Sequence, residues 1–272
     1  MKSDSVALIY FSPTSTTKQV LEYIAQGIAA ETTEHIDLTL PASLKGLENG
    51  LAVSADVALL GVPVYAGRVP PVAAQRLQRI QGQGVPAVVV AVYGNRAYED
   101  ALVELKDLAA GCGFVPIAGG AFIGEHSFAT NQRPIANGRP DDADAAEARS
   151  FGVKIGDTLA SVSSVTEFGT LQVPGNVPYK DRPELKKVAP VVDQETCILC
   201  GTCEESCPSG AISIDEAVHP DPESCILCHA CVKNCPTSAI AFQAPPLEEM
   251  AEKLSRECRT RQEPEIYLAI SG

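Results

Sequence analysis

Residues 197–212 read CILCGTCEESCPSGAI, and residues 225–240 read CILCHACVKNCPTSAI. The two stretches share nine of their sixteen positions and form an internal repeat with the spacing Cys-x-x-Cys-x-x-Cys-x-x-x-Cys-Pro. Together they hold eight of the ten cysteines, while Cys112 and Cys258 lie apart from them. A disulfide-stabilised fold is typically a short secreted chain with cysteines spread along it. The clustering of the cysteines therefore indicates metal sites.

The spacing of the repeat predicts two 4Fe-4S clusters, because three thiolates at intervals of three residues let one loop hold three irons, and the fourth cysteine ligates the other cluster. One cluster would be held by Cys197, Cys200, Cys203 and Cys235, and the other by Cys225, Cys228, Cys231 and Cys207. A pair of structural zinc sites is the alternative, but zinc prefers paired ligands separated by a long gap. His229 lies between two ligands and is expected to be an exposed loop residue.

Residues 191–243 as a whole resemble a bacterial two-cluster ferredoxin, which implies a small α+β domain. Before them, residues 166–190 read as an extended linker that follows the surface, interrupted by Pro174, Pro178, Pro183 and Pro190. After them, residues 244–272 predict a C-terminal amphipathic helix over Pro246–Arg261 and a short strand over Glu265–Ile270. This tail would dock the ferredoxin part onto the rest of the chain or onto a second subunit, which leaves a homodimer open.

Residues 1–165 alternate between strand and helix patterns. Val6–Phe11 is a continuous apolar run, as expected of a strand buried on both faces, and His35–Leu38 is a short strand candidate. Further strands are expected at Val57–Val64, Ala87–Tyr93 and Phe114–Ile123. Helices are expected between and after them, over Thr16–Ala30, Pro70–Ile80, Ala97–Ala110 and Asp141–Ala160. Five strands separated by helices predict a parallel sheet with helices on both faces. Ligands of such sheets bind beyond the carboxyl ends of the strands, so the loops after the first, third and fourth strands matter most.

The loop after the first strand is Ser12-Pro13-Thr14-Ser15-Thr16-Thr17. Hydroxyl and N–H groups at a strand-to-helix turn form an anion site that is strengthened by the helix dipole. The loop lacks the glycines and the Gly-Lys pair of a Walker loop, and no Gly-x-Gly-x-x-Gly follows the strand. A helix-capping box is the alternative interpretation.

In its α/β context this hydroxyl loop resembles the phosphate loop of flavodoxins, except that Ser15 stands where flavodoxins usually have glycine. The resemblance implies strand order 2-1-3-4-5 and bound FMN, whose ring would lie between loops 63–68 and 93–98. Tyr65 and Tyr98 would stack on the ring, the Gly67 peptide would turn over, and Arg68 or Arg96 would stabilise negative charge. The predicted FMN-binding residues are Ser12, Thr14, Ser15, Thr16, Thr17, Pro63, Val64, Tyr65, Ala66, Gly67, Tyr93, Gly94, Asn95, Arg96 and Tyr98.

The composition restricts the class of partner. The chain has 272 residues, of which 45% are hydrophobic and 20% charged, and its net charge is −13. Such an acidic chain is not expected to bind nucleic acid or an anionic membrane as its main function. No stretch is long and apolar enough to span a membrane, and no signal peptide is evident, so a cytoplasmic location is expected.

The whole chain resembles flavodoxin–ferredoxin fusion proteins of anaerobic microbes. The resemblance implies electron transfer between ferredoxin-type redox partners of low potential, two 4Fe-4S clusters and FMN, with no catalytic residues required. An FMN-dependent reductase of a quinone or nitro compound, with the clusters as electron input, is the alternative. The loop from His126 to Pro140 keeps that alternative open because it is long enough to cover the flavin. A redox-sensing interaction module is a third interpretation.

Overall fold

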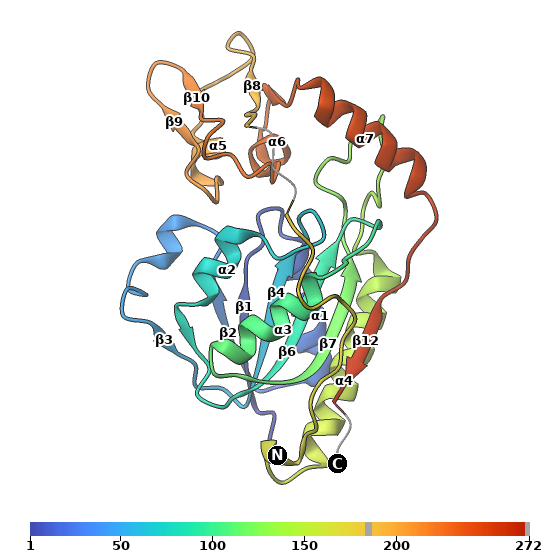
Figure 1. Ribbon diagram of the computed structural model, residues 1–272. Helices are drawn as coiled ribbons and strands as arrows, with labels where there is room; N and C mark the ends of the chain where they lie inside the picture. The colour runs from blue at the N-terminus through green and yellow to red at the C-terminus, as the bar shows by residue number, and fades with distance from the viewer. Residues whose placement is uncertain (183–186, 270–272) are drawn as a thin grey trace.

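The computed structural model describes residues 1–182 and 187–269 and contains a six-stranded sheet in the order β12-β7-β6-β4-β1-β2 (Figure 1). The strands are β1 (Ser5–Tyr10), β2 (Thr32–Asp37), β4 (Val57–Pro63), β6 (Pro86–Tyr93), β7 (Val115–Ile123) and β12 (Glu265–Leu268). The first five are parallel and, counted along the chain, stand in the order 2-1-3-4-5. The expected five-stranded sheet is corrected to six, because β12 pairs antiparallel with β7.

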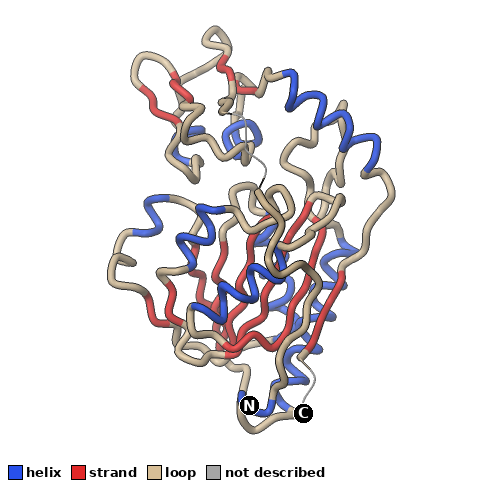
Figure 2. Tube along the Cα trace, in the orientation of Figure 1, coloured by secondary structure: helices blue, strands red, loops and turns tan. Residues whose placement is uncertain are grey.

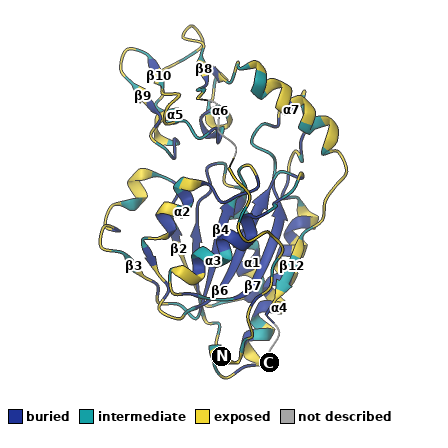
Figure 3. Ribbon diagram, in the orientation of Figure 1, coloured by how far each residue is buried: buried dark blue, intermediate teal, exposed yellow. Residues whose placement is uncertain are grey.

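Helices cover both faces of this sheet, because the residues of each central strand are buried on alternate sides. Val6 and Leu8 of β1 pack toward α1 (Thr16–Ile28) and α4 (Asp142–Ala160), whereas Ala7 and Ile9 pack toward α2 (Pro71–Leu77) and α3 (Ala101–Gly111). Figure 3 shows the strands as the buried layer between the two sets of helices. The result is a doubly wound α/β domain with its carboxyl strand ends directed toward the cysteine-rich part (Figure 1).

Short elements that the sequence did not predict lie at the edges of this domain. They are the 3-10 helices Pro41–Leu44 and Val165–Glu167 and the paired strands β3 (Leu51–Ala52) and β5 (Ile80–Gln81). The predicted helix over Ala97–Ala110 begins only at Ala101, because Asn95 and Glu99 adopt left-handed backbone conformations (φ 61° and 44°).

The predicted linker lies along α3, to which several hydrogen bonds attach it. Asp100 accepts hydrogen bonds from the backbone N–H groups of Asn176 (2.8 Å) and Lys180 (2.7 Å). The Tyr179 hydroxyl donates to Asp107 at 2.6 Å, and Leu171 is buried in the core. Pro183 of the predicted linker lies outside the described residues.

The cysteine-rich part is built twice from the same backbone pattern. Its elements are β8 (Val191–Val192), α5 (Thr202–Glu205), β9 (Ile212–Ile214), β10 (Val218–Pro220), α6 (Ala230–Asn234) and β11 (Ile240–Ala241), with β9–β10 and β8–β11 antiparallel. Left-handed residues occupy matching positions of the two repeats, in the pairs Leu199 and Leu227, Gly201 and His229, and Gly210 and Ser238. The repeat seen in the sequence is thus also a repeat in conformation.

The C-terminal segment leaves the cysteine-rich part through α7 (Pro245–Glu257) and returns to the sheet domain as β12 (Figure 2). The helix ends four residues before the predicted Arg261, and Ile270 lies outside the described residues. Of the two dockings considered for the tail, the structure has the one within the same chain. In the described part of the chain, no helix combines the length and the apolar character needed to cross a membrane.

Candidate functional site

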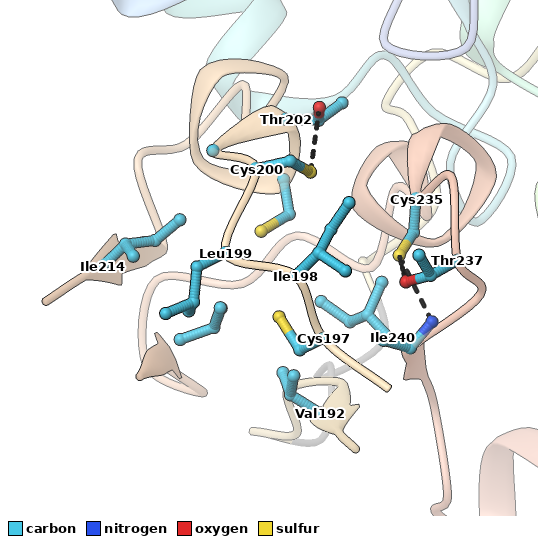
Figure 4. A pocket seen from close by; sticks show the side chains of 14 residues that line it. Val192, Cys197, Ile198, Leu199, Cys200, Thr202, Ile214, Cys235, Thr237 and Ile240 are labelled. Atoms are coloured by element: carbon cyan, nitrogen blue, oxygen red, sulfur yellow. Dashed lines mark hydrogen bonds between the residues drawn. The ribbon is translucent and has the colours of Figure 1, made fainter. Parts of the chain in front are cut away.

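The eight cysteines of the repeat line two separate cavities, one of which is shown in Figure 4. Cys197, Cys200, Cys203 and Cys235 surround the first cavity, and Cys207, Cys225, Cys228 and Cys231 surround the second. The structure thus brings together the two sets of four that the spacing predicts, each completed by a cysteine from the other repeat. Within residues 1–182 and 187–269, no three Cys, His, Asp or Glu side chains are grouped as around a single metal ion.

Hydrogen bonds to the sulfur atoms follow the same repeat. The backbone N–H of Ala211 donates to Cys207 Sγ at 3.2 Å, and that of Ala239 donates to Cys235 Sγ at 3.3 Å. The Thr202 hydroxyl lies 3.4 Å from Cys200 Sγ, as the dashed line in Figure 4 shows. Donors aimed at sulfur stabilise thiolate charge, and the apolar side chains around them exclude water. Both features fit an iron–sulfur cluster in each cavity.

The two cavities differ in exposure to solvent. Cys200 of the first cavity is exposed, and the neighbouring Ile198 and Leu199 are 64% and 45% exposed. Cys207, Cys228 and Cys231 of the second cavity are buried, and burial raises the pKa of Cys228 and Cys231 to about 12. The hydrogen bonds from Thr202 instead lower the pKa of Cys200. The first cavity therefore faces outward and the second faces inward.

The second cavity lies against the sheet domain at the carboxyl ends of its strands. Arg76 of α2 donates to the carbonyl oxygen of Pro208, next to Cys207, at 2.6 Å. Lys233 of α6 donates to the carbonyl oxygen of Ala129 at 3.0 Å and forms an ion pair with Glu125. Ile226, beside Cys225, packs against the apolar core of the sheet domain. These contacts join the loops around the second cavity to the carboxyl edge of the sheet, where the flavin is expected to bind.

A row of aromatic rings also crosses this junction. The His126 and Phe128 ring centroids are 4.9 Å apart, those of Phe128 and His229 are 4.6 Å apart, and those of His229 and Phe242 are 4.4 Å apart. The expectation that His229 is an exposed loop residue is wrong, because its ring is enclosed between two phenylalanines. Burial lowers the pKa of His229 to about 3 and that of His126 to about 4, so both rings are neutral near pH 7.

The hydroxyl loop has open hydrogen-bonding capacity. Thr17 Oγ1 is buried without a hydrogen-bond partner among the described residues. Ser15 makes no side-chain capping bond, so the capping-box alternative is wrong, although Ser12 Oγ accepts a hydrogen bond from the N–H of Lys18 at 3.1 Å. Ser15 adopts φ 66°, the left-handed conformation expected of the glycine it replaces. An orphan hydroxyl at a helix start fits an anionic phosphate.

In the loop after β4, the positions of Tyr65 and Gly67 fit the predicted flavin site, whereas that of Arg68 does not. Tyr65 is half-buried and forms an isolated bridge with Arg68, while Gly67 adopts φ 77°, which favours glycine. A Cβ atom at Gly67 would lie 2.4 Å from Glu99 Oε2. The flavin role considered for Arg68 is wrong, because its buried guanidinium donates to both carboxylate oxygens of Glu104, at 2.7 and 3.0 Å.

The loop after β6 mainly anchors the C-terminal tail. The Asn95 amide donates to the carbonyl oxygens of Cys258 and Thr260, both at 2.8 Å. The Tyr98 hydroxyl contacts Glu265 and Tyr267, both at 2.9 Å, and its ring is buried in the core. Tyr98 is thus positioned to hold the tail and not to stack on a flavin, which corrects that prediction.

The remaining residues of this loop are differently placed. Arg96 is exposed and pairs with Glu99. A Cβ atom at Gly94 would lie 2.3 Å from the His126 ring, so the glycine permits the aromatic row to approach the sheet. Tyr93 is buried beside Tyr98, with 5.5 Å between the ring centroids. The other predicted residues lie at the same edge of the sheet: Thr14 in the loop after β1, Thr16 at the start of α1, Pro63 at the end of β4, and Val64 and Ala66 in the loop after β4.

Three buried arginines organise the edge of the sheet domain; sequence reasoning missed Arg76 and Arg139 and gave Arg68 a different role. Arg139 is held by Asp144 and donates to the carbonyl oxygen of Gln262 at 2.9 Å. Arg68 is held by Glu104, whereas Arg76 donates to carbonyl oxygens and lies over the Phe11 ring, 5.8 Å from its centroid. Arg139 and Asp144 are five residues apart around a helix start, and no periodic pattern marks such a pair.

Comparison with known proteins bears on both parts of the chain. Residues 196–239 match the family model of the 4Fe-4S dicluster domain. No curated protein sequence gives a significant match to the chain.

Solved structures of flavodoxins and flavodiiron proteins are similar to the sheet domain at low identity. A flavodoxin from the domain Archaea is 15% identical over 57% of this chain and 99% of that chain, with a TM-score of 0.37. Rubredoxin oxygen:oxidoreductase from the anaerobe Desulfovibrio gigas is 16% identical over 59% of this chain and 37% of that chain, with a TM-score of 0.42. A Fusobacterium nucleatum flavodoxin bound to flavin mononucleotide is 15% identical over 57% of this chain and 98% of that chain, with a TM-score of 0.38.

The assignment of the fold rests on the strand order and the family match. The parallel strands in the order 2-1-3-4-5 define the flavodoxin-like topology. The cysteine-rich residues match the dicluster family. The chain therefore combines an α/β domain of flavodoxin-like topology with residues 196–239, which match the 4Fe-4S dicluster domain.

Proposed function

We propose that this protein transfers electrons between redox-protein partners, two 4Fe-4S clusters and one FMN. The observation that carries this proposal is the position of the second cysteine cavity against the carboxyl edge of the flavodoxin-like sheet. Bound clusters would supply one-electron chemistry, and bound FMN would accept or donate one or two electrons. The order along the chain of carriers is then first cluster, second cluster and flavin.

The first cluster would be the point of exchange with a partner. Ile198 and Leu199 form an exposed apolar tip beside Cys200. Residues 191–243 carry eight acidic groups and a single basic one, Lys233, so the surface around the tip is negative. Opposite charge on a redox partner would steer its approach, and the tip would supply the short-range contact.

The second cluster would be a relay. The cysteines around this cluster are largely buried. Tyr65, in the loop after β4, lies near Cys228. Burial raises the pKa of Tyr65, and the negative charge of the Cys228 thiolate raises it further. The aromatic row from His126 to Phe242 and the Lys233–Glu125 ion pair hold the cluster loop on the sheet domain. A fixed, water-poor junction favours electron transfer within one chain.

The FMN phosphate would bind at the hydroxyl loop, with Thr17 Oγ1 as one donor and the N-terminus of α1 as the positive end of a dipole. The ring would lie near Tyr65 and Gly67, and we do not assign it to Tyr98. Ser12, Thr14, Ser15, Thr16 and the backbone of loops 63–67 and 93–96 complete the proposed site.

Substitution of Thr17 tests the flavin site, because it is expected to raise the stability of the apoprotein and to lower the affinity for FMN. Thr17→Val removes a buried hydroxyl that lacks a partner, so the apoprotein is expected to gain up to about 1 kcal/mol of stability. The same change removes a phosphate donor, and FMN affinity is expected to fall roughly tenfold, which corresponds to about 1.4 kcal/mol. Flavin fluorescence titration and urea unfolding measure the two effects.

Thr17→Ser is the matched control, because it keeps the hydroxyl and is expected to retain FMN affinity. If Thr17→Val leaves the FMN affinity unchanged, or if both variants lose affinity equally, the FMN phosphate does not bind to the Thr17 hydroxyl.

The alternative function is reduction of a small acceptor. Anaerobic stopped-flow of the reduced holoprotein with quinones, nitroaromatic compounds and oxidised ferredoxin separates the two. Electron exchange with ferredoxin, together with slow and unsaturable reduction of the small molecules, supports the carrier. Fast, saturable turnover of a quinone or nitro compound would instead identify a reductase.

A further inference from the structure

Arg76 occupies an unusual position between the two parts of the chain. It lies on α2, is 6% exposed, and directs its guanidinium at three backbone carbonyl oxygens. Leu38 O lies 2.9 Å from one terminal nitrogen, which also contacts Thr39 O, and Pro208 O lies 2.6 Å from the other. Thr39 also receives the N–H of Ser12 on its hydroxyl, so Arg76 joins the hydroxyl loop to the second cluster loop.

No carboxylate among the described residues lies within ion-pair distance of Arg76, and the more distant Asp37 offsets only part of the effect of burial on its pKa. The other two buried arginines behave differently, because Arg68 is held by Glu104 and Arg139 by Asp144. An ion pair offsets much of the cost of burying a guanidinium, whereas carbonyl dipoles alone leave a net positive charge inside the protein. Burial accordingly lowers the pKa of Arg76.

A negative group belongs close to this charge. Pro208 directly follows Cys207, which is buried and lines the second cavity. A four-iron cluster held by four thiolates carries net negative charge, and this charge grows by one electron on reduction. A fixed positive charge beside the cluster stabilises the reduced form more than the oxidised form, which raises the reduction potential.

We propose that Arg76 is the buried counter-charge of the second cluster, a positioning residue that holds the Cys207–Pro208 turn and raises the reduction potential of that cluster relative to the first. This inference rests on the proposed two-cluster function. In the redox step one electron enters the cluster from the first cluster, no bond forms or breaks, and the guanidinium keeps its proton. The potential difference would favour flow from the exposed cluster toward the flavin.

Arg76→Gln, Arg76→Lys and Arg79→Gln test the proposal in the full-length holoprotein. Arg79 is the matched control, because it lies three residues further on, is half-exposed, and makes no side-chain hydrogen bond among the described residues. EPR-monitored redox titration gives the midpoint potential of each cluster. Thr202→Val identifies the first cluster, since it removes the hydroxyl beside Cys200.

The proposal predicts that Arg76→Gln lowers the potential of the cluster that Thr202→Val leaves unchanged. The expected size is roughly a tenfold change in the ratio of oxidised to reduced cluster, or about 59 mV for one electron. Arg76→Lys keeps the charge and is expected to stay near the parent potential, and Arg79→Gln is expected to leave both potentials unchanged. The proposal would be overturned if Arg79→Gln shifted the potential equally, if Arg76→Gln shifted the potential of the first cluster, or if Arg76→Gln shifted neither potential.

Two further outcomes are decisive. If Arg76→Gln fails to hold its clusters, Arg76→Lys decides, because a tenfold shift in that variant would show that geometry matters and the charge does not. If the parent protein lacks two clusters, the proposed function fails and this inference fails with it. Two clusters in the parent protein with unmoved potentials in the variants would overturn the role of Arg76 alone.

Discussion

Buried polar side chains carry much of the specificity of this fold at the scale of single residues. Asn95 adopts a left-handed conformation and uses its amide to hold the tail, and its Oδ1 accepts the N–H of Gln262 at 2.9 Å. His126 is similarly engaged, because its Nδ1 accepts a hydrogen bond from the N–H of Phe128 at 3.0 Å. Losing one such bond in a buried site typically costs about 1–3 kcal/mol.

His126 gives the protein a defined response to acid. Its pKa is lowered to about 4 by burial and by the nearby charges of Arg96 and Lys233, whereas an unfolded histidine titrates near 6.5. Between these values the unfolded chain binds the proton and the folded chain does not, so stability falls as pH falls from 6.5 toward 4. We expect this residue to remove about 1–2 kcal/mol of unfolding free energy between pH 7 and pH 5.

His126→Asn is the comparison, because an asparagine Oδ1 can accept the Phe128 N–H and does not titrate. Urea unfolding of the two holoproteins at both pH values gives the difference, and acid effects on the clusters are common to both. Equal losses in the two proteins would show that His126 is not the titrating group.

At the scale of secondary structure, the strands and helices that bury a full apolar face could be predicted from the sequence. The short elements that form only by pairing with another segment could not. Asp141–Ala160 was predictable from its acidic start and apolar spacing, and the helix indeed begins after Asp141 with a capping box. The pairing of β12 could not be predicted from the sequence, because its four residues form a strand only by pairing with the edge of β7. Of the site, the cysteine sets followed from spacing, whereas Arg76 and His229 depend on domain docking.

Close contact between α1 and α4 yields a matched pair of substitutions. A Cβ atom at Gly152 would lie 2.1 Å from the carbonyl oxygen of Ile24, while one at Gly156 would lie 3.8 Å from that of Ile28. Gly152→Ala forces the helices apart and is expected to cost about 2–3 kcal/mol. Gly156→Ala is expected to gain about 0.5–1 kcal/mol from helix propensity.

Chemical denaturation of the two variants measures this difference directly. Because both glycines lie on α4, helix propensity affects them alike and the contact with α1 alone separates them. Similar stability of the two variants would mean that the helices are not packed as closely as described.

At the scale of the whole molecule, the two cavities define an outside and an inside for the electron path. The first cavity opens beside the exposed tip Ile198–Leu199, whereas the loops around the second cavity contact the sheet domain through Pro208, Ile226 and Lys233. The C-terminal tail, with α7 and β12, joins the far side of the cysteine-rich part back to the sheet (Figure 1). The linker and the tail thus attach the cysteine-rich part to the sheet domain at both of its ends.

The exposed tip predicts where a partner exchanges electrons. Replacing Ile198 and Leu199 by serine removes the apolar contact, and electron uptake from a reduced ferredoxin is expected to slow at least about fivefold. Reduction by dithionite and the iron content are expected to stay unchanged. Val153→Ser, at a 50% exposed position on α4, is the control. A partner rate that is unaffected by the double substitution would place the entry point elsewhere.

Laser-flash reduction of the anaerobic holoprotein is the most direct measurement of electron transfer inside one chain. An external photoreductant delivers one electron, and absorbance then follows the iron–sulfur and flavin bands separately. Cluster bleaching is expected first, followed by flavin reduction at a rate that does not depend on protein concentration. Flavin reduction that accelerates in proportion to protein concentration, or that does not follow cluster reduction, would contradict a relay from the second cluster to the flavin.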